Sequence, residues 1–321
     1  MSDERTTRPR LGLALGGGGA RGLAHIGVLR VLEREAIPIA CIAGTSMGGL
    51  IGALYAAGVA IDRVEAEVVR LSRLTEQLRL LDVEWSAAGL SVRGRRIYNV
   101  LAELLGEELT FADLRLPLAM VAVDIHTGRP VVLQGGLVID AVRATISIPG
   151  IFTPVDLGGY RLVDGGVLDN VPVDVAQELG ATHTLAVDVL PSFSRNRPGV
   201  APVETGLQLA FAPQQFAEVY HVLMIMIAAV TEAQLRQYPP DLLIRPVLSP
   251  HVTLLSGFNR AEEIIAAGQT AAEDALPAIR DLLAGGLERG TGDAPSARPR
   301  RPRPRPTTRG DCNCPDRRSQ T

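Results

Sequence analysis

Short apolar runs alternate along the chain with stretches whose apolar residues recur every three or four positions. The continuous runs predict strands that are covered on both faces of a sheet, and the periodic stretches predict helices that cover it. Strands and helices that alternate in this way indicate an α/β fold with a mostly parallel central sheet. The expected strands lie at 11–15, 37–43, 116–125, 160–163, 184–189 and 241–247, and the expected helices at 20–35, 49–57, 62–81, 96–105, 138–146, 173–179, 206–236 and 259–287.

The same pattern divides the 321 residues into four parts. A polar leader at 1–10 precedes a domain at 11–190 that holds most of the sheet. Residues 191–288 supply further helices and are expected to complete this domain. Repeated Arg-Pro pairs cannot bury enough apolar surface to form a core, so the tail at 289–321 is expected to be disordered.

The distribution of charge excludes nucleic acid as the expected partner. The chain has a formal net charge of −3, but nine arginines and three aspartates give residues 289–321 a charge of +6, which leaves −9 on residues 1–288. A protein that binds nucleic acid needs a basic face to displace counterions from the phosphates. The basic tail is expected to be a solvated extension, and attraction to anionic lipids is the alternative.

Cysteine content and hydropathy favour a protein of the cytoplasm. Three cysteines cannot form a disulfide framework, as expected in a reducing compartment. The most apolar helical stretch, residues 219–230, is too short to span a bilayer and is expected to be a buried core helix. Peripheral contact with a membrane remains compatible with the sequence.

The first of three glycine-containing motifs places a serine at a sharp turn. Ser46 follows a predicted strand, precedes a predicted helix and is flanked by Gly44 and Gly48. Such glycines let strand and helix approach closely, so that the serine hydroxyl projects as a nucleophile. The first turn of the following helix also offers free N–H groups that favour a developing anion. An ordinary strand-to-helix turn is the alternative interpretation.

The second motif is a run of glycines between the first strand and the first helix, formed by Gly16, Gly17, Gly18, Gly19, Ala20, Arg21 and Gly22. Its backbone N–H groups can converge on an anion, either a nucleotide phosphate or the oxyanion of an ester under attack. The spacing also matches a dinucleotide fingerprint. That fingerprint needs an acidic residue at the end of the second strand, which this chain lacks, and no lysine is present for a P-loop. The oxyanion hole is therefore preferred, and a nucleotide site is the alternative.

The third motif, Asp164-Gly165-Gly166, follows a short predicted strand. A carboxylate on a glycine turn can orient and deprotonate a serine. Asp-Gly is also a common turn signal, and Asp156 or Asp169 could serve as the base instead. These residues alone leave the choice of base open.

Taken together and in this order, the three motifs resemble those of the bacterial patatin-like phospholipase family. The glycine run matches the family's oxyanion motif and continues through residues 23–29 as in bacterial members. Gly44–Gly48 matches the nucleophile elbow, and Asp164–Gly166 matches the Asp-Gly-Gly/Ala motif. Residues 147–154 resemble the segment that precedes this aspartate in the family. The resemblance covers residues 11–190.

The resemblance implies a three-layer α/β/α patatin-like fold and hydrolysis of glycerolipid acyl esters by a Ser–Asp dyad, with neither a metal nor another cofactor. Ser46 would attack the ester carbonyl and Asp164 would take its proton. The oxyanion would be stabilised by the amides of Gly17, Gly18, Gly19 and Ala20. Arg21 would assist the oxyanion, bind lipid phosphate or brace the loop, and the sequence does not separate these roles.

Two further interpretations fit the sequence less well. A Ser-His-Asp triad needs a histidine after the acid, but none of the later histidines lies in a glycine-rich loop, and His25 is expected to support the first helix. A catalytically silent regulator with the same fold would usually have lost Ser46 or Asp164, and both are present.

Overall fold

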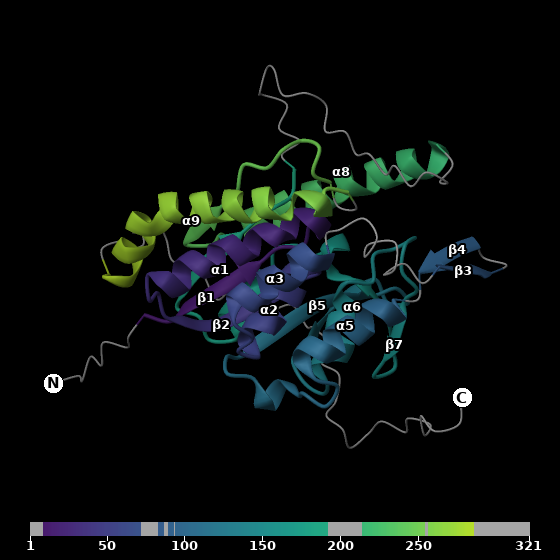
Figure 1. The fold of residues 1–321 in the computed structure, drawn as a ribbon, viewed down its shortest axis with the longest axis horizontal. Coiled ribbons are helices and arrows are strands. Elements are labelled where there is room, and N and C mark those ends of the chain that lie inside the picture. The colour runs from purple at the N-terminus through teal and green to yellow at the C-terminus, as the bar shows by residue number, and fades with distance from the viewer. Residues whose placement is uncertain are drawn as a thin grey trace.

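The computed structural model describes residues 9–71, 83–86, 89–92, 94–191, 214–253 and 256–285. The first eight residues of the leader and the whole Arg-Pro tail therefore lie outside the described residues. So do the end of the helix predicted at 62–81 and the start of the one predicted at 206–236. The described residues form an eight-stranded mixed sheet with helices packed against it, and a separate two-stranded hairpin (Figure 1).

The central sheet has eight strands in the order β10-β9-β1-β2-β5-β8-β7, with β6 paired to β5. All pairs from β10 to β5 are parallel, whereas β5–β6, β5–β8 and β8–β7 are antiparallel. The predicted α/β class with a mostly parallel sheet is confirmed, although β6 and β7 were not predicted. The strands are β1 (Leu11–Leu15), β2 (Ile39–Thr45), β5 (Leu118–Asp124), β6 (Arg129–Leu133), β7 (Val155–Leu157), β8 (Tyr160–Asp164), β9 (His183–Val187) and β10 (Leu242–Ile244).

The helices follow the predicted periodic stretches closely. A separate hairpin, also not predicted, is formed by β3 (Val83–Ser86) and β4 (Gly89–Val92). Short 3-10 turns occur at η1 (Gly19–Leu23), η2 (Phe111–Asp113), η3 (Gly165–Val167) and η4 (Phe258–Arg260). The described α-helices are α1 (Ala24–Arg34), α2 (Met47–Ala56), α3 (Ile61–Leu71), α5 (Arg95–Leu105), α6 (Val138–Thr145), α7 (Val173–Glu178), α8 (Gln214–Gln237) and α9 (Ala261–Leu283).

The two faces of the sheet are filled by side chains of different size. On β1, Leu13 and Leu15 point into a large core shared with α1, α2, α3, α5, α6 and α9, whereas Ala14 faces a thinner layer formed by α7 and the end of α8. This alternation follows from the two-residue period of a strand. The small side chains let α7 lie close to the sheet and complete the three layers.

Helices α1 and α9 lie side by side with their backbones in contact (Figure 1). A Cβ on Gly27 would overlap the carbonyl oxygen of Ile265, and a Cβ on Gly268 would overlap that of Ala24. Glycine is required at both positions because no side chain fits between the helices. The last described helix thus shares the core of the sheet.

Helix α8 differs from the buried core helix that its sequence predicted. Its segment Glu218–Gln237 has a mean hydropathy of 1.3 and is long and apolar enough, by length and composition alone, to cross a membrane. Only 22% of this segment is buried, so the prediction of a core helix is wrong. One face packs on the protein through Tyr220 and Met224, while the other exposes the apolar side chains of Val219, Val222, Ile225 and Met226.

Candidate active site

Strand pairing brings the ends of β2 and β8 to one point. A strand has two edges, and β6 occupies one edge of β5. β2 and β8 must therefore share the other edge, where Thr45 of β2 lies opposite Val121 and Asp164 of β8 lies opposite Ala122. Since β2 and β8 run in opposite directions, Ser46, the residue that follows β2, meets the last residue of β8.

Ser46 occupies a strained turn between β2 and α2. Its backbone angles of φ 53° and ψ −124° lie in a region that residues other than glycine rarely adopt. The Ser46 N–H donates to Oγ1 of Thr145 at 2.9 Å, which holds the turn. A Cβ on Gly44 would lie 2.6 Å from the main chain of α2, and a Cβ on Gly48 would overlap a carbonyl oxygen of β1. Close packing of strand and helix is thus what directs the Ser46 side chain out of the turn.

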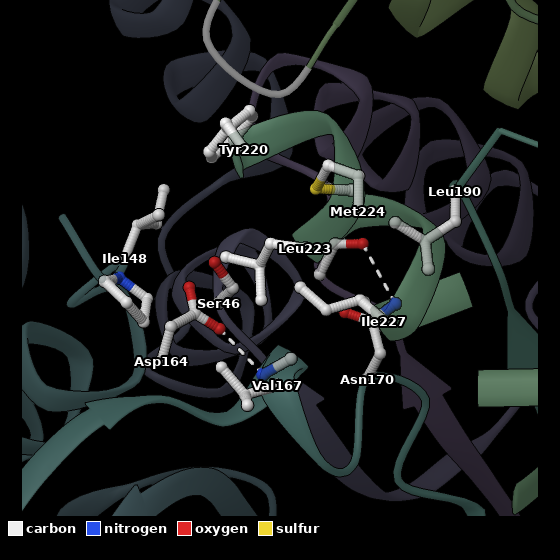
Figure 2. Close-up of a pocket in the computed structure, with 14 residues that line it drawn as sticks. Ser46, Ile148, Asp164, Val167, Asn170, Leu190, Tyr220, Leu223, Met224 and Ile227 are labelled. Atoms are coloured by element: carbon white, nitrogen blue, oxygen red, sulfur yellow. Dashed lines mark hydrogen bonds between the residues drawn. The ribbon is translucent and has the colours of Figure 1, made fainter. Parts of the chain in front are cut away.

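Asp164 lies beside Ser46, as Figure 2 shows. Its carboxylate accepts a hydrogen bond from the N–H of Gly166 at 2.8 Å, and the nearby Ser46 hydroxyl also stabilises its ionised form. The residue is only 6% exposed. Burial raises the pKa of Asp164 from 3.8 to about 6, against the opposing effect of Ser46 and Gly166. A carboxylate with this pKa is largely ionised at pH 7 and is a stronger base than an exposed aspartate.

The glycine loop contributes Gly17 and Gly18 to the same pocket. The N–H of Gly17 already donates to the main-chain oxygen of Asn170, at 3.2 Å. Within the described residues the N–H groups of Gly18, Gly19 and Ala20 donate no hydrogen bond, and Gly18 is the one of these three that lines the pocket. The expected set of four oxyanion donors therefore narrows to Gly18 as the first candidate.

Arg21 binds main-chain carbonyls behind the loop and is absent from the pocket lining. Its Nε donates to the oxygen of Val189 at 2.5 Å and its Nη1 to the oxygen of Val252 at 2.9 Å. Burial lowers the pKa of Arg21 to about 10, although the charge of nearby Asp188 opposes this shift. Of the three roles that the sequence left open, these contacts fit the bracing of the loop.

His25 holds the beginning of the loop. Its ring is fully buried, and Nε2 lies 2.7 Å from the carbonyl oxygen of Gly16. Since a carbonyl only accepts, Nε2 carries the proton. Burial lowers the pKa of His25 to about 4, so the ring is neutral at pH 7. His25 therefore supports the glycine loop from the first turn of α1.

The remaining motif glycines allow close contacts around the pocket. A Cβ on Gly22 would lie 2.5 Å from a side chain of α2, and a Cβ on Gly165 would overlap a carbonyl oxygen of β5. A Cβ on Gly166 would lie 2.9 Å from Oδ1 of Asn170. Each glycine thus keeps two parts of the site in contact.

The pocket has a volume of about 30 Å³. One face of α8 closes it with Tyr220, Leu223, Met224 and Ile227, whose spacing of three or four residues puts them on one side of the helix (Figure 2). The Tyr220 hydroxyl is buried without a hydrogen-bond partner in the described part of the chain, and burial together with the charge of Asp164 raises its pKa. The other apolar lining comes from Ile148, Pro149, Val167 and Leu190.

The other acidic residues that the sequence offered as bases lie elsewhere. Asp156 is exposed and pairs with Arg161 on the neighbouring strand. Asp169 is buried, but it does not line the pocket. No histidine lines the pocket either, and no group of three or more His, Cys, Asp or Glu residues within the described ranges is arranged to hold a metal.

Three residues of the site were not recognised from the sequence. Thr145 holds the turn of Ser46, Asn170 binds the glycine loop, and Tyr220 closes the pocket. Asn170 carried a weak signal, because it follows the Asp164 motif after a few residues. Thr145 and Tyr220 carried none, since nothing in a periodic pattern marks a contact between distant parts of the chain.

Comparison with known proteins gives relatives over the same region. A family model described as patatin-like phospholipase matches residues 13–176. An uncharacterized NTE family protein of Mycobacterium tuberculosis is 39% identical over 186 residues, which are 57% of this chain and 50% of the relative. The neuropathy target esterase sws of Drosophila melanogaster is 33% identical over 183 residues, which are 56% of this chain and 13% of the relative.

Solved structures with a related arrangement include VipD from Legionella pneumophila, with a TM-score of 0.45, 12% identity and coverage of 84% of this chain and 67% of VipD. The chain spans half the length of its mycobacterial relative and a small part of the animal esterase. The family model nevertheless covers 164 of 321 residues and includes the glycine loop, Ser46 and Asp164. The chain belongs to the patatin-like phospholipase family.

Proposed function

We propose that this protein is a serine hydrolase that cleaves fatty-acyl esters of lipids, with Ser46 as nucleophile and Asp164 as base. The observation that carries this proposal is the placement of the Ser46 hydroxyl beside a buried carboxylate of raised pKa. Gly18, whose amide N–H has no hydrogen-bond partner among the described residues, lines the same pocket. Family membership and the esterase named among the relatives support the same class of reaction.

Acylation begins as the Ser46 oxygen attacks the ester carbonyl carbon while its proton passes to Asp164. The carbonyl electrons move to the oxygen, which becomes an oxyanion beside the N–H of Gly18. The start of α2, directly after Ser46, adds the partial positive charge of a helix N-terminus. Collapse of this intermediate expels the alkoxide, which takes the proton from Asp164 and leaves as an alcohol.

Deacylation repeats these steps with water. Asp164 accepts a proton from the water as the water oxygen adds to the acyl carbonyl, and a second oxyanion forms at the same donor. Collapse releases the fatty acid and returns the proton from Asp164 to the Ser46 oxygen. Each step balances with one serine, one carboxylate and one water, and the raised pKa of Asp164 suits a group that both accepts and returns a proton.

The pocket suits an apolar acyl chain, because Asp164 is the one charged residue among the described residues that line it. Its volume of about 30 Å³ holds one or two water molecules. An acyl chain therefore enters only when the side chains of α8 move. The opposite face of this helix exposes Val219, Val222 and Met226, and we propose that this face rests on the lipid aggregate from which the substrate comes.

A fluorophosphonate probe and a soluble p-nitrophenyl ester test the proposal. We expect labelling and turnover in the wild type, neither in Ser46→Ala, and a loss of about 10²- to 10⁴-fold in kcat for Asp164→Asn. Ser249→Ala is the matched control, because the Ser249 hydroxyl binds Arg260 outside the pocket. Turnover that persists in Ser46→Ala would place the nucleophile elsewhere, and a wild type that is folded but unlabelled would favour a silent regulator.

A further inference from the structure

The glycine loop needs an external support if it is to present an N–H group in a fixed direction. Glycine has wide conformational freedom, so a peptide plane between two glycines rotates easily unless both of its polar groups are held. The plane between Gly17 and Gly18 carries the carbonyl of the first residue and the N–H of the second. Because the peptide group is planar and trans, these two groups point in opposite directions. Holding the carbonyl therefore sets the direction of the N–H.

Asn170 holds this carbonyl. Its Nδ2 donates to the oxygen of Gly17 at 3.2 Å, and its own main-chain oxygen accepts the N–H of Gly17, also at 3.2 Å. One residue thus binds the peptide planes on both sides of Gly17 (Figure 2 marks the side-chain bond). The plane before Gly17 is held a second time by His25, through the carbonyl of Gly16. Along the glycine loop, Gly18 is the first residue whose N–H has no hydrogen-bond partner among the described residues.

Asn170 is itself held rigidly next to both reacting groups. It is 3% exposed, and the residue before it accepts a hydrogen bond from Oγ1 of Thr45 at 2.8 Å, one position before Ser46. A Cβ on Gly166 would lie 2.9 Å from Oδ1 of Asn170 and 3.1 Å from Oδ1 of Asp164, so the amide lies close to the base. Asn170 therefore links the glycine loop, the serine turn and the aspartate turn.

We propose that Asn170 is a positioning residue whose side-chain amide directs the Gly18 N–H at the oxyanion. This inference rests on the proposed function and adds to it a residue that acts through the main chain. Nδ2 donates to the Gly17 carbonyl, and the Gly18 N–H points the opposite way across the trans peptide group, from a residue that lines the pocket. The amide touches no reacting atom, so its loss weakens binding of the transition state more than binding of the substrate.

Two variants and one control test this role. Asn170→Ala removes the side-chain donor, and Asn170→Asp keeps the shape but replaces the donor with oxygen. Gln234→Ala is the control, because the Gln234 amide donates in the same way to the carbonyl of Leu168, at 3.3 Å, from outside the pocket lining. The measurements are kcat and KM for a soluble p-nitrophenyl ester, and the inhibition constant of an alkyl boronic acid, which forms a tetrahedral adduct with an active serine.

For both Asn170 variants we expect kcat to fall about 10- to 100-fold, with KM changed less than twofold. Removal of one oxyanion donor costs roughly 10²- to 10³-fold, and here the donor is misdirected but still present. The boronic acid should lose affinity by a similar factor, because its adduct needs the same N–H. Gln234→Ala should retain the wild-type kcat and the wild-type boronic acid affinity.

The pH dependence of Asn170→Asp separates positioning from packing. When the carboxyl group that this substitution introduces is protonated, it can again donate to the Gly17 carbonyl, so the ratio of variant to wild-type kcat should rise as the pH falls from 8 to 5. When the same group is ionised, its charge would raise the pKa of Asp164. Less of the Asp164 carboxylate would then be ionised at low pH, which would lower this ratio as the pH falls. Because these two effects oppose each other, a ratio that rises as the pH falls supports the role of Asn170, and the uncharged Asn170→Ala variant decides it. If folded Asn170→Ala keeps kcat and boronic acid affinity within twofold of the wild type, the role of Asn170 is overturned. An unlabelled wild type overturns the proposed function as well, which distinguishes the two failures.

Discussion

Asp164→Asn tests the electrostatics of the site through stability as well as through activity. Asparagine keeps the shape of the side chain and an oxygen that can accept from Gly166 and Ser46, but it has no charge to bury. Burial raises the pKa of Asp164 from 3.8 to about 6, which means that the folded protein disfavours the ionised form. The variant should therefore be more stable than the wild type at neutral pH, although its kcat should be lower by the 10²- to 10⁴-fold expected above.

The size of this gain in stability follows from the linkage between proton binding and folding. The folded protein binds the proton more tightly than the unfolded chain, so the free energy of unfolding falls as the pH rises from about 4 to about 6. Above that range the loss is constant, and one pKa unit corresponds to about 1.4 kcal/mol. The shift of Asp164 thus lowers stability by at most about 3 kcal/mol at pH 8, by about half of that at pH 5, and by nothing below pH 3.

Urea denaturation of the wild type and Asp164→Asn at pH 8 and pH 5 measures the effect, with equal m-values required for the comparison. We expect the variant to exceed the wild type by a larger margin at pH 8 than at pH 5. A difference independent of pH would show that the change acts through packing. A variant less stable than the wild type at pH 8 would refute the assignment of Asp164 as a buried charge.

Three further predictions concern the wild type, the glycine loop and α8. The kcat/KM of the wild type should rise with pH through a single ionisation near pH 6, the pKa of the buried carboxylate, in a pH-stat assay; a midpoint near 4 would contradict this. Gly17→Ala would place a Cβ 2.7 Å from Oδ1 of Asn170 and 3.0 Å from Cβ of Ser46, so we expect kcat to fall about 100-fold. Gly135→Ala, which meets nothing within 4 Å, should not change kcat. Replacement of Val222 and Met226, which are 55% and 59% exposed, with serine should reduce hydrolysis of phospholipid vesicles about 10-fold while sparing a soluble ester. Val247→Ser, at a 91% exposed position, should leave both rates unchanged.

The sequence predicted most of the parallel half of the fold because its signals are local. The buried strands are continuous apolar runs. Gly44 and Gly48 mark a close turn between strand and helix, and the structure places Ser46 in that turn. The antiparallel strands β6 and β7 were missed, since Arg129–Leu133 and Val155–Leu157 are short and only partly apolar. Their pairing depends on contacts with β5 and β8 that no local pattern records.

Helix α8 was misjudged for a different physical reason. High hydropathy usually predicts burial, but it reports the composition of a helix and says nothing of what covers each face. Residues 219–230 are apolar almost all round, which led to the expectation of a core helix. In the structure one face closes the pocket and the other faces solvent. Only the tertiary arrangement distinguishes these two faces.

The strained backbone of Ser46 and the buried carboxylate of Asp164 both destabilise the fold, and both have one origin. This origin is the meeting of β2 and β8 on a single edge of β5. The chain must leave β2 sharply to avoid the incoming strand, which forces the strained backbone of Ser46. The end of β8 is enclosed by the same packing, which excludes water from Asp164 and raises its pKa. Substitutions that relieve the strain or hydrate the carboxylate should therefore stabilise the fold and weaken the base together. In the proposed mechanism, the meeting of β2 and β8 is therefore what makes Ser46 and Asp164 a reactive pair.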